Sequence, residues 1–267
     1  MPTFNAENAE IWRELCEVDY FTQFIKSWLA FNAWMRNAYP DIRQDRDLIE
    51  IIKEQSNPVR NKIRSLLTDT GQHGQTFRNM VADLHSQLEN THLISQKDTV
   101  ERRITFSEWH LENLTSESIF SHWGADYSIM RFTSGNDKGK IKVSVVKQKD
   151  KSSLYEFQQD KYNLDELKAH LPLQKLLSTR RNKIMEAYIL IGPLKRISWL
   201  AGPGEAALEI GSYKFKNDVN GLSSAIIEII YQMRCLLFHG ELVPRKSYNL
   251  VYEPAYRIVK VFLDALH

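Results

Sequence analysis

This sequence has few cysteines and no long apolar runs. Both features exclude particular classes of protein. Only Cys16 and Cys235 are present, far apart in the chain, which excludes a disulfide framework and any CxxC zinc or redox site. No run approaches the ~18 apolar residues of a transmembrane helix. The N-terminal segment MPTFNAENAEIW lacks the basic and apolar regions of a signal peptide. We therefore expect a reduced, cytoplasmic protein without a membrane partner.

An excess of charge of one sign is also lacking, because 35 basic residues nearly balance 33 acidic ones, for a net charge of +2. The two halves nevertheless differ. Residues 1–130 carry 13 basic and 19 acidic side chains, a net −6, whereas residues 131–267 carry 22 and 14, a net +8. A polyanion such as RNA would bind more readily to the second half. Solvated lysine-rich faces explain the same asymmetry, so charge alone identifies no partner.

The 267 residues have the composition of a globular protein, with 43% hydrophobic and 25% charged residues. Near the start of the chain, aromatic residues recur with a helical period. Within residues 7–39 an apolar stripe recurs at intervals of three and four: Phe21, Phe24, Trp28, Phe31 and Met35. Such a stripe predicts a buried helix face or a helix–helix interface rather than a cofactor site. Asp19 is expected to cap a helix in this stretch, and Pro40 to stop it.

Further along, the hydrophobic period changes from helical to alternating and back. The expected helices span 7–39, 41–55, 59–67, 75–88, 163–177, 180–190 and 222–238, with a last one reaching about 266. The expected strands span 127–133, 141–146, 154–157 and 207–215, the first two joined as a hairpin. Residues 90–124 are polar and poorly periodic, apart from a helical turn or two around 106–114.

These patterns predict a mainly α protein, a helical bundle with a small β-containing insertion in the middle of the chain. Residues 1–89 would supply the N-terminal helices of the bundle, and residues 216–267 its C-terminal helices. Residues 90–215 would form the insertion, with the β-hairpin and further helices.

The helix expected over 222–238 is the segment best able to carry chemistry. At about 100° per residue, its apolar residues fall on one broad face. The opposite side carries a file of polar groups: Ser224, Glu228, Gln232, Cys235 and His239. Arg234 lies on the flank of this file, about 7.5 Å along the helix axis from His239. An anion such as a phosphodiester could sit between Arg234 and His239.

An arginine and a histidine at this separation suit cleavage of the RNA backbone. A base must take the 2′-OH proton, an acid must protonate the leaving 5′-oxygen, and positive charge must stabilise the phosphorane. Histidine can act as acid or base near neutral pH, and arginine stays charged and grips phosphate. No metal or other cofactor is required, and no His, Cys and carboxylate cluster has metal-ligand spacing.

The spacing alone does not choose a site, because similar arginine–histidine pairs occur at Arg78/His85 and Arg103/His110. Residues 231–241, YQMRCLLFHGE, resemble the Arg-x4-6-His helix of the HEPN superfamily, close to its R-C-N-L-F-H-G variant. Residues 24–34, FIKSWLAFNAW, resemble the W-x-A-F-N first helix of the same group. Together the two segments cover about a tenth of the chain.

The HEPN resemblance implies an all-helical core with a middle insertion, and a dimer in which two Arg/His pairs share one cleft. Many members are metal-independent ribonucleases that act as toxins or in defence against phage, and Arg234 and His239 would be the catalytic pair. The chain departs from the variant at Leu236, where the variant has Asn, and at Cys235, where members often have a polar residue. Arg78 with His85 therefore stays the second candidate pair.

Other polar residues are expected to assist this site. Glu228 and Gln232 would support the pair, and a basic set would contact RNA phosphates: Arg180, Arg181, Lys183, Arg245 and Lys246. Plain structural roles fit each of them too, with His239 as a helix cap, Arg234 in a salt bridge and the basic set as solvated surface.

Our first hypothesis is a cytoplasmic, homodimeric endoribonuclease of HEPN type, with RNA as substrate and an antitoxin or defence-system protein as a further partner. Two alternatives stay open. One is a catalytically silent module that binds a nucleotide, RNA or protein through the same polar file. The other is a structural dimer whose apolar first helix forms the interface.

Overall fold

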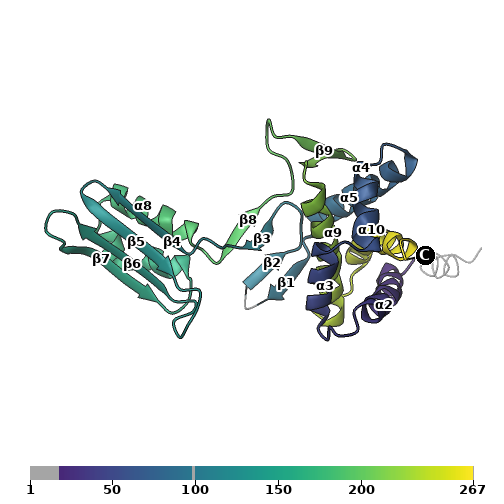
Figure 1. Ribbon diagram of the computed structural model, residues 1–267, viewed down its shortest axis with the longest axis horizontal. Coiled ribbons are helices and arrows are strands. Elements are labelled where there is room, and N and C mark those ends of the chain that lie inside the picture. The colour runs from purple at the N-terminus through teal and green to yellow at the C-terminus, as the bar shows by residue number, and fades with distance from the viewer. Residues whose placement is uncertain (1–17, 98–99, 267) are drawn as a thin grey trace, which may run out of the picture. The chain divides into compact units, whose positions relative to one another are not determined.

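The structure, a computed structural model, describes residues 18–97 and 100–266 (Figure 1). The chain divides into two compact units, each described by itself. Unit 1 takes the residues up to Trp109 and those from Ser198 onward, and unit 2 is the continuous stretch His110–Ile197. Trp12 and Cys16 lie outside the described residues.

Six helices and two hairpins form unit 1 within the described residues. The helices are α2 (Tyr20–Ala38), α3 (Asp45–Glu54), α4 (Pro58–Thr68), α5 (Gln72–Thr91), α9 (Val219–Phe238) and α10 (Lys246–Asp264). The hairpins pair β1 (Ile94–Lys97) with β2 (Val100–Arg103), and β9 (Ala207–Ile210) with β10 (Tyr213–Lys216). Helix α10 packs against both α2 and α5, so the C-terminal part of the chain completes a core begun by the N-terminal part.

Helix α2 begins and packs as its sequence predicts. The Asp19 side chain accepts the Thr22 N–H at 3.1 Å, which caps the first turn. The apolar stripe is buried in the unit 1 core, with Phe21 only partly covered: Phe24, Trp28, Phe31 and Met35. Because this face is used inside unit 1, it is not available as the dimer interface that one alternative required.

Helix α9 is long and apolar enough to cross a membrane by length and composition, and among the described residues it is the one helix of this kind. Of its apolar window, 56% is buried inside the structure. Ile226, Ile229, Ile230 and Met233 are fully buried in the unit 1 core. Helix α9 is therefore the central helix of this core.

Unit 2 is built on an antiparallel four-stranded sheet in the order β4-β5-β6-β7. The strands are β4 (Glu117–His122), β5 (Ala125–Arg131), β6 (Ile141–Lys147) and β7 (Ser153–Gln159). Three helices follow the last strand: α6 (Leu164–Ala169), α7 (Leu171–Gln174) and α8 (Ser178–Leu190). At the two ends of the unit, β3 (Trp109–Glu112) pairs with β8 (Leu194–Ile197).

The core of unit 2 lies between one face of the sheet and its helices, and Figure 1 shows α8 against that face. Tyr127 and Ile129 of β5 stand opposite Val145 and Val143 of β6, and all four side chains are buried. Alternate burial along both strands confirms the hairpin expected over 127–146. The intervening residues of β5 and β6 form the other face of the sheet.

The prediction of a mainly α, HEPN-like helical bundle is wrong. The described residues contain ten strands, which form one antiparallel four-stranded sheet and three two-stranded sheets. The fold is therefore a mixture of helices and sheets. Strands β1 to β4 lie in the polar stretch that showed no clear period. Short hairpin and edge strands have few buried positions, so they carry little alternation for a sequence pattern to reveal.

Three further elements differ from their sequence patterns. The helical turn or two expected around 106–114 is absent, and strand β3 lies there instead. The single strand expected over 207–215 is the β9–β10 hairpin, which turns at Gly211 with φ +59°. A Cβ at Gly211 would lie 2.6 Å from the Ala82 Cβ, so both the turn and the packing require glycine here. The single helix expected over 163–177 is divided into α6 and α7 at His170, just before Pro172.

Candidate functional site

The candidate site lies at the C-terminal end of α9, which has a complete Schellman cap. The Glu241 N–H donates to the Leu236 carbonyl at 3.1 Å, and the Gly240 N–H donates to the Leu237 carbonyl at 3.3 Å. Gly240 has φ +67°, the left-handed conformation that this cap needs. The exposed His239 is the C-cap residue, directly after Phe238, the last residue of the helix.

Arg234 is held on the side of α9 that faces α3. Its Nη2 donates to Asp45 Oδ2 at 2.8 Å, and the side chain is 14% exposed. The guanidinium carbon lies 4.3 Å from the centre of the Phe238 ring and 5.8 Å from that of Trp28. Asp45 also pairs with Arg36, so two guanidinium groups share one carboxylate. The three side chains therefore keep a net positive charge.

Glu228 is the centre of a second ion-pair cluster between α3 and α9. Its carboxylate, 6% exposed, pairs with Arg46 at 2.6 Å and Lys53 at 2.8 Å, and Gln232 Nε2 donates to it at 3.1 Å. Burial alone would raise the pKa of Glu228, but the hydrogen bonds and charges of Arg46 and Lys53 outweigh burial and hold this pKa below its usual value. Glu228 thus joins α9 to α3, and Gln232 supports it from one turn further along the same helix.

The remaining members of the polar file are also covered. Ser224 donates to the Lys53 carbonyl at 2.9 Å, which continues the seam between α9 and α3. Burial, followed by the neighbouring Cys235, raises the pKa of Tyr231 to about 12. Leu236, where the HEPN variant has Asn, is fully buried in the unit 1 core. The polar side of α9 is therefore packed against α3 at Ser224 and Glu228, whereas Cys235 is half-buried and His239 is exposed.

The second candidate pair is divided between two structural roles. Arg78 is on α5, and its guanidinium reaches the C-terminal end of α4, where Nη1 donates to the Asp69 carbonyl at 2.5 Å and to the carbonyls of Leu66 and Leu67. His85 is 2% exposed, within 4.5 Å of the Tyr213 ring centre, and burial lowers its pKa. A histidine enclosed in this way has no access to a substrate.

The structure describes the side chain of only one member of the pair Arg103/His110. Arg103 pairs with Glu89 at 3.0 Å and donates to the carbonyls at the end of α5. The side chain of His110 lies outside the described residues.

Replacing Arg78 with alanine is expected to lower the free energy of unfolding by about 1–2 kcal/mol, because three carbonyls at the end of α4 lose a charged donor. Urea unfolding monitored by far-UV circular dichroism measures the change. Lys62→Ala removes the same charge from an exposed position on α4 and should cost no more than ~0.5 kcal/mol. Equal losses for the two variants would contradict the capping role.

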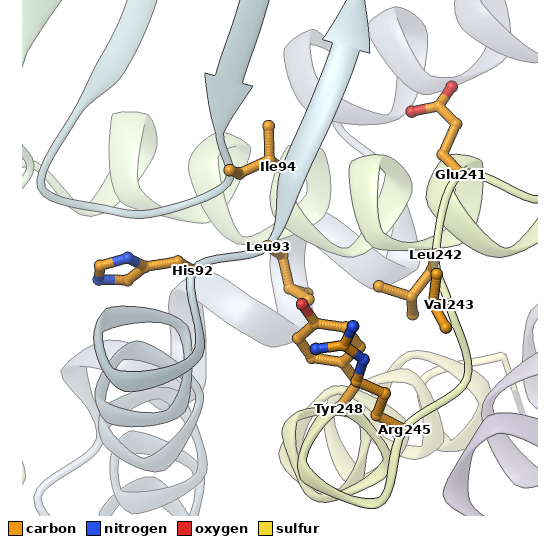
Figure 2. Close-up of a pocket in the computed structure, with 8 residues that line it drawn as sticks. All are labelled: His92, Leu93, Ile94, Glu241, Leu242, Val243, Arg245 and Tyr248. Atoms are coloured by element: carbon orange, nitrogen blue, oxygen red, sulfur yellow. The ribbon is translucent and has the colours of Figure 1, made fainter.

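A pocket of about 330 Å³ opens beside the loop that follows α9 (Figure 2). It is lined by His92, Leu93, Ile94, Glu241, Leu242, Val243, Arg245 and Tyr248. Figure 2 shows Leu93, Arg245 and Tyr248 gathered together, with His92 and the Glu241 carboxylate directed away from them. The centre of the pocket thus offers apolar walls, a phenol and one guanidinium.

This pocket adjoins the exposed histidine. Glu241 lies two residues after His239, so their Cα atoms are within about 7.6 Å of each other. Arg245, expected to contact RNA, is part of the lining, and Lys246 begins α10.

The other residues expected to bind RNA are on α8 of unit 2. Lys183 pairs with Glu186 at 2.7 Å, and Arg181 Nη1 donates to Gln174 Oε1 at 3.4 Å. Arg180 is partly buried on the same helix. The basic set therefore belongs to two units, and only Arg245 lines the pocket next to α9.

Across residues 18–97 and 100–266, no three His, Cys, Asp or Glu side chains come together in a group that could hold a metal ion. Comparisons with protein-family models, curated proteins and solved structures find no match to this chain. The HEPN assignment stays a prediction that rests on the two short segments in α2 and α9.

Proposed function

We propose that the chain is a metal-independent endoribonuclease that cleaves RNA at the C-terminal end of α9. His239 acts as acid or base, and Arg234 stabilises the phosphorane. The observation that carries the proposal is the exposure of His239 at the capped end of the same helix that holds an oriented guanidinium. Solvent access is needed for proton transfer to a substrate, and a fixed cation is needed for the developing charge.

The surroundings of Arg234 favour an anion. Asp45 orients the guanidinium of Arg234, and because Asp45 also pairs with Arg36 it does not cancel the positive charge of the group. A preorganised charge stabilises a transition state without reorganisation during the reaction. Arg234 would therefore act from the position in which the structure holds it.

The adjoining pocket suits one nucleotide. Its volume of about 330 Å³ is in the range of small-molecule sites, and its walls combine Leu93, Leu242 and Val243 with the ring of Tyr248. Apolar and aromatic groups can cover a base, and the guanidinium of Arg245 can bind a neighbouring phosphate. On this proposal the protein is a cytoplasmic homodimer, a toxin or phage-defence effector that acts on RNA and is restrained by an antitoxin or defence-system protein.

The test compares purified wild type and His239→Ala on mixed RNA in EDTA. Wild type should cleave, and loss of an acid–base group should slow cleavage at least ~10²-fold. His73→Ala, which removes another exposed histidine of unit 1, should leave the rate unchanged. Equal rates for His239→Ala and wild type would place the activity elsewhere. Loss of wild-type cleavage in EDTA would overturn the metal-free mechanism.

A catalytically silent binding module is the second candidate, and the tight contact of Arg234 with Asp45 at 14% exposure favours it. In that case wild type leaves RNA intact but retains it in a filter-binding assay. Arg245→Ala should then weaken retention, because Arg245 lines the pocket.

A further inference from the structure

Strand β4 is an edge of the unit 2 sheet, and among the described residues no strand pairs with its outer side. The Arg131 N–H donates to the Ser116 carbonyl at 2.7 Å, so residue 116 and every second residue after it turn their backbone groups toward β5. The backbone groups of Glu117, Ile119 and Ser121 therefore face outward. They form a row of amides and carbonyls that another strand can pair with.

This edge lacks most of the features that usually block pairing, and its one acidic side chain, Glu117, is at its first position. Strand β4 contains no lysine, no proline and no register shift. The opposite edge strand, β7, pairs with β6 through a register shift at Val145/Val146, a feature that protects edges. Ile119, in the middle of β4, is 66% exposed, an unusual position for a large apolar side chain on an unpaired edge.

We infer that β4 pairs with the β4 strand of a second copy of this chain, antiparallel and about a twofold axis through Ile119. The outward-facing residues of the two β4 strands can be paired in several registers. The register centred on Ile119 places Ile119 opposite Ile119 of the second copy, and Glu117 opposite Ser121. No like charges are opposed, and a twofold interface closes on itself as a dimer. The two sheets become one sheet of eight strands.

The helix beside the edge fits the same pairing. Helix α8 contacts both β4 and β5, so it lies about one strand spacing, 4.8 Å, from the proposed axis beside β4. The two copies of α8 would therefore be about 10 Å apart across the axis. Helices pack at 8–10 Å. The groove between β4 and α8, about 380 Å³ in volume, is lined by Phe120, Ala187 and Leu190 among others. Ala187 is buried in the unit 2 core, so the part of α8 that a second copy would meet is formed by Leu190, 55% exposed, and by the ion pair of Lys183 with Glu186.

The inference does not rest on the proposed nuclease activity, because none of the residues that define the β4 edge takes part in the proposed cleavage. Light scattering coupled to gel filtration should give wild type a mass of about twice 31.2 kDa. Ile119→Lys, which places two like charges at the axis, should halve that mass. Gln158→Lys adds the same charge to the exposed edge strand β7 and should leave the dimer intact. Far-UV circular dichroism should show all three chains folded.

A monomeric wild type, or an Ile119→Lys chain that stays dimeric, would overturn the inference. The register has its own test. Ile119→Cys, in a chain with serine in place of both native cysteines, should form a disulfide-linked dimer on oxidation, since facing Cα atoms are about 5.5 Å apart in such a pair. Gln158→Cys should not. Absence of the Ile119→Cys dimer would overturn the register, and an RNA cleavage assay on the same samples shows separately whether the nuclease proposal holds.

Discussion

Replacing Glu228 with alanine is expected to lower the free energy of unfolding by about 3–5 kcal/mol. The carboxylate is 6% exposed and pairs with both Arg46 and Lys53. Without it, Arg46 and Lys53, the latter 13% exposed, keep only Glu50 of their own helix as a counter-charge, and the charged link between α3 and α9 is lost. Urea unfolding at neutral pH measures the loss.

Glu54→Ala is the matched control, because Glu54 is an exposed glutamate at the end of α3. It should change the free energy of unfolding by no more than ~0.5 kcal/mol. A loss below about 1 kcal/mol for Glu228→Ala would contradict a buried network between α3 and α9.

The contribution of Glu228 should also depend on pH. Because its pKa in the folded chain is below the ordinary value of 4.5, its stabilising effect is fully present above that value and is lost as pH falls through the folded pKa. Wild type should therefore lose stability in acid more steeply than Glu228→Ala. Parallel stability curves for the two chains below pH 4.5 would contradict this linkage.

Replacing Phe31 with alanine should also lower the free energy of unfolding by about 3–5 kcal/mol. Phe31 is fully buried, and its ring centre lies 5.5 Å from those of both Trp28 and Phe262. The substitution leaves a cavity where α2 meets α10, so it combines lost burial with lost aromatic contacts. Thermal and urea unfolding both measure the change.

Leu29→Ala is the control for this position, since Leu29 is on the same helix and 51% exposed. Its cost should stay below about 1 kcal/mol, because little apolar area is removed from contact. A cost as large as that of Phe31→Ala would mean that the outer face of α2 is covered by another surface.

The sequence predicted the elements that carry strong local signals. The apolar stripe of α2 and its Asp19 cap, and the length of α9 up to Gly240, follow from a period near 3.6 and from capping chemistry. The alternating strands β5 and β6 followed from a buried face on a period of two.

The missed strands had no such signal. Strand β4, ESIFSH, is an edge whose burial alternates only between exposed and half-buried positions, so its side chains need not be apolar. The turn at Gly211 is set by the approach of Ala82, which lies far away in the sequence. A local pattern carries no information on such a contact.

The candidate site shows the same division. The order of Arg234 and His239 along one helix could be predicted, and the structure places His239 at the exposed end of that helix. The partner of Arg234 is Asp45, 189 residues away, and nothing in the periodicity of α9 indicates that α3 covers its polar side. A salt bridge of Arg234 was one alternative from the sequence, but its partner could not be named because ion pairs between distant elements leave no local pattern.

Because unit 1 is assembled from two stretches of chain separated by all of unit 2, its order of synthesis matters. Helices α2 to α5 leave the ribosome long before α9 and α10, which complete their core. At about 5–20 residues/s, the 155 residues from His110 to Asp264 at the end of α10 take about 8–30 s to make. Unit 2 can fold in that interval, while Phe24 still lacks Tyr252 and Trp28 still lacks Tyr231. Newly made chains should therefore need chaperone protection over helices α2 to α5 until α10 has been made.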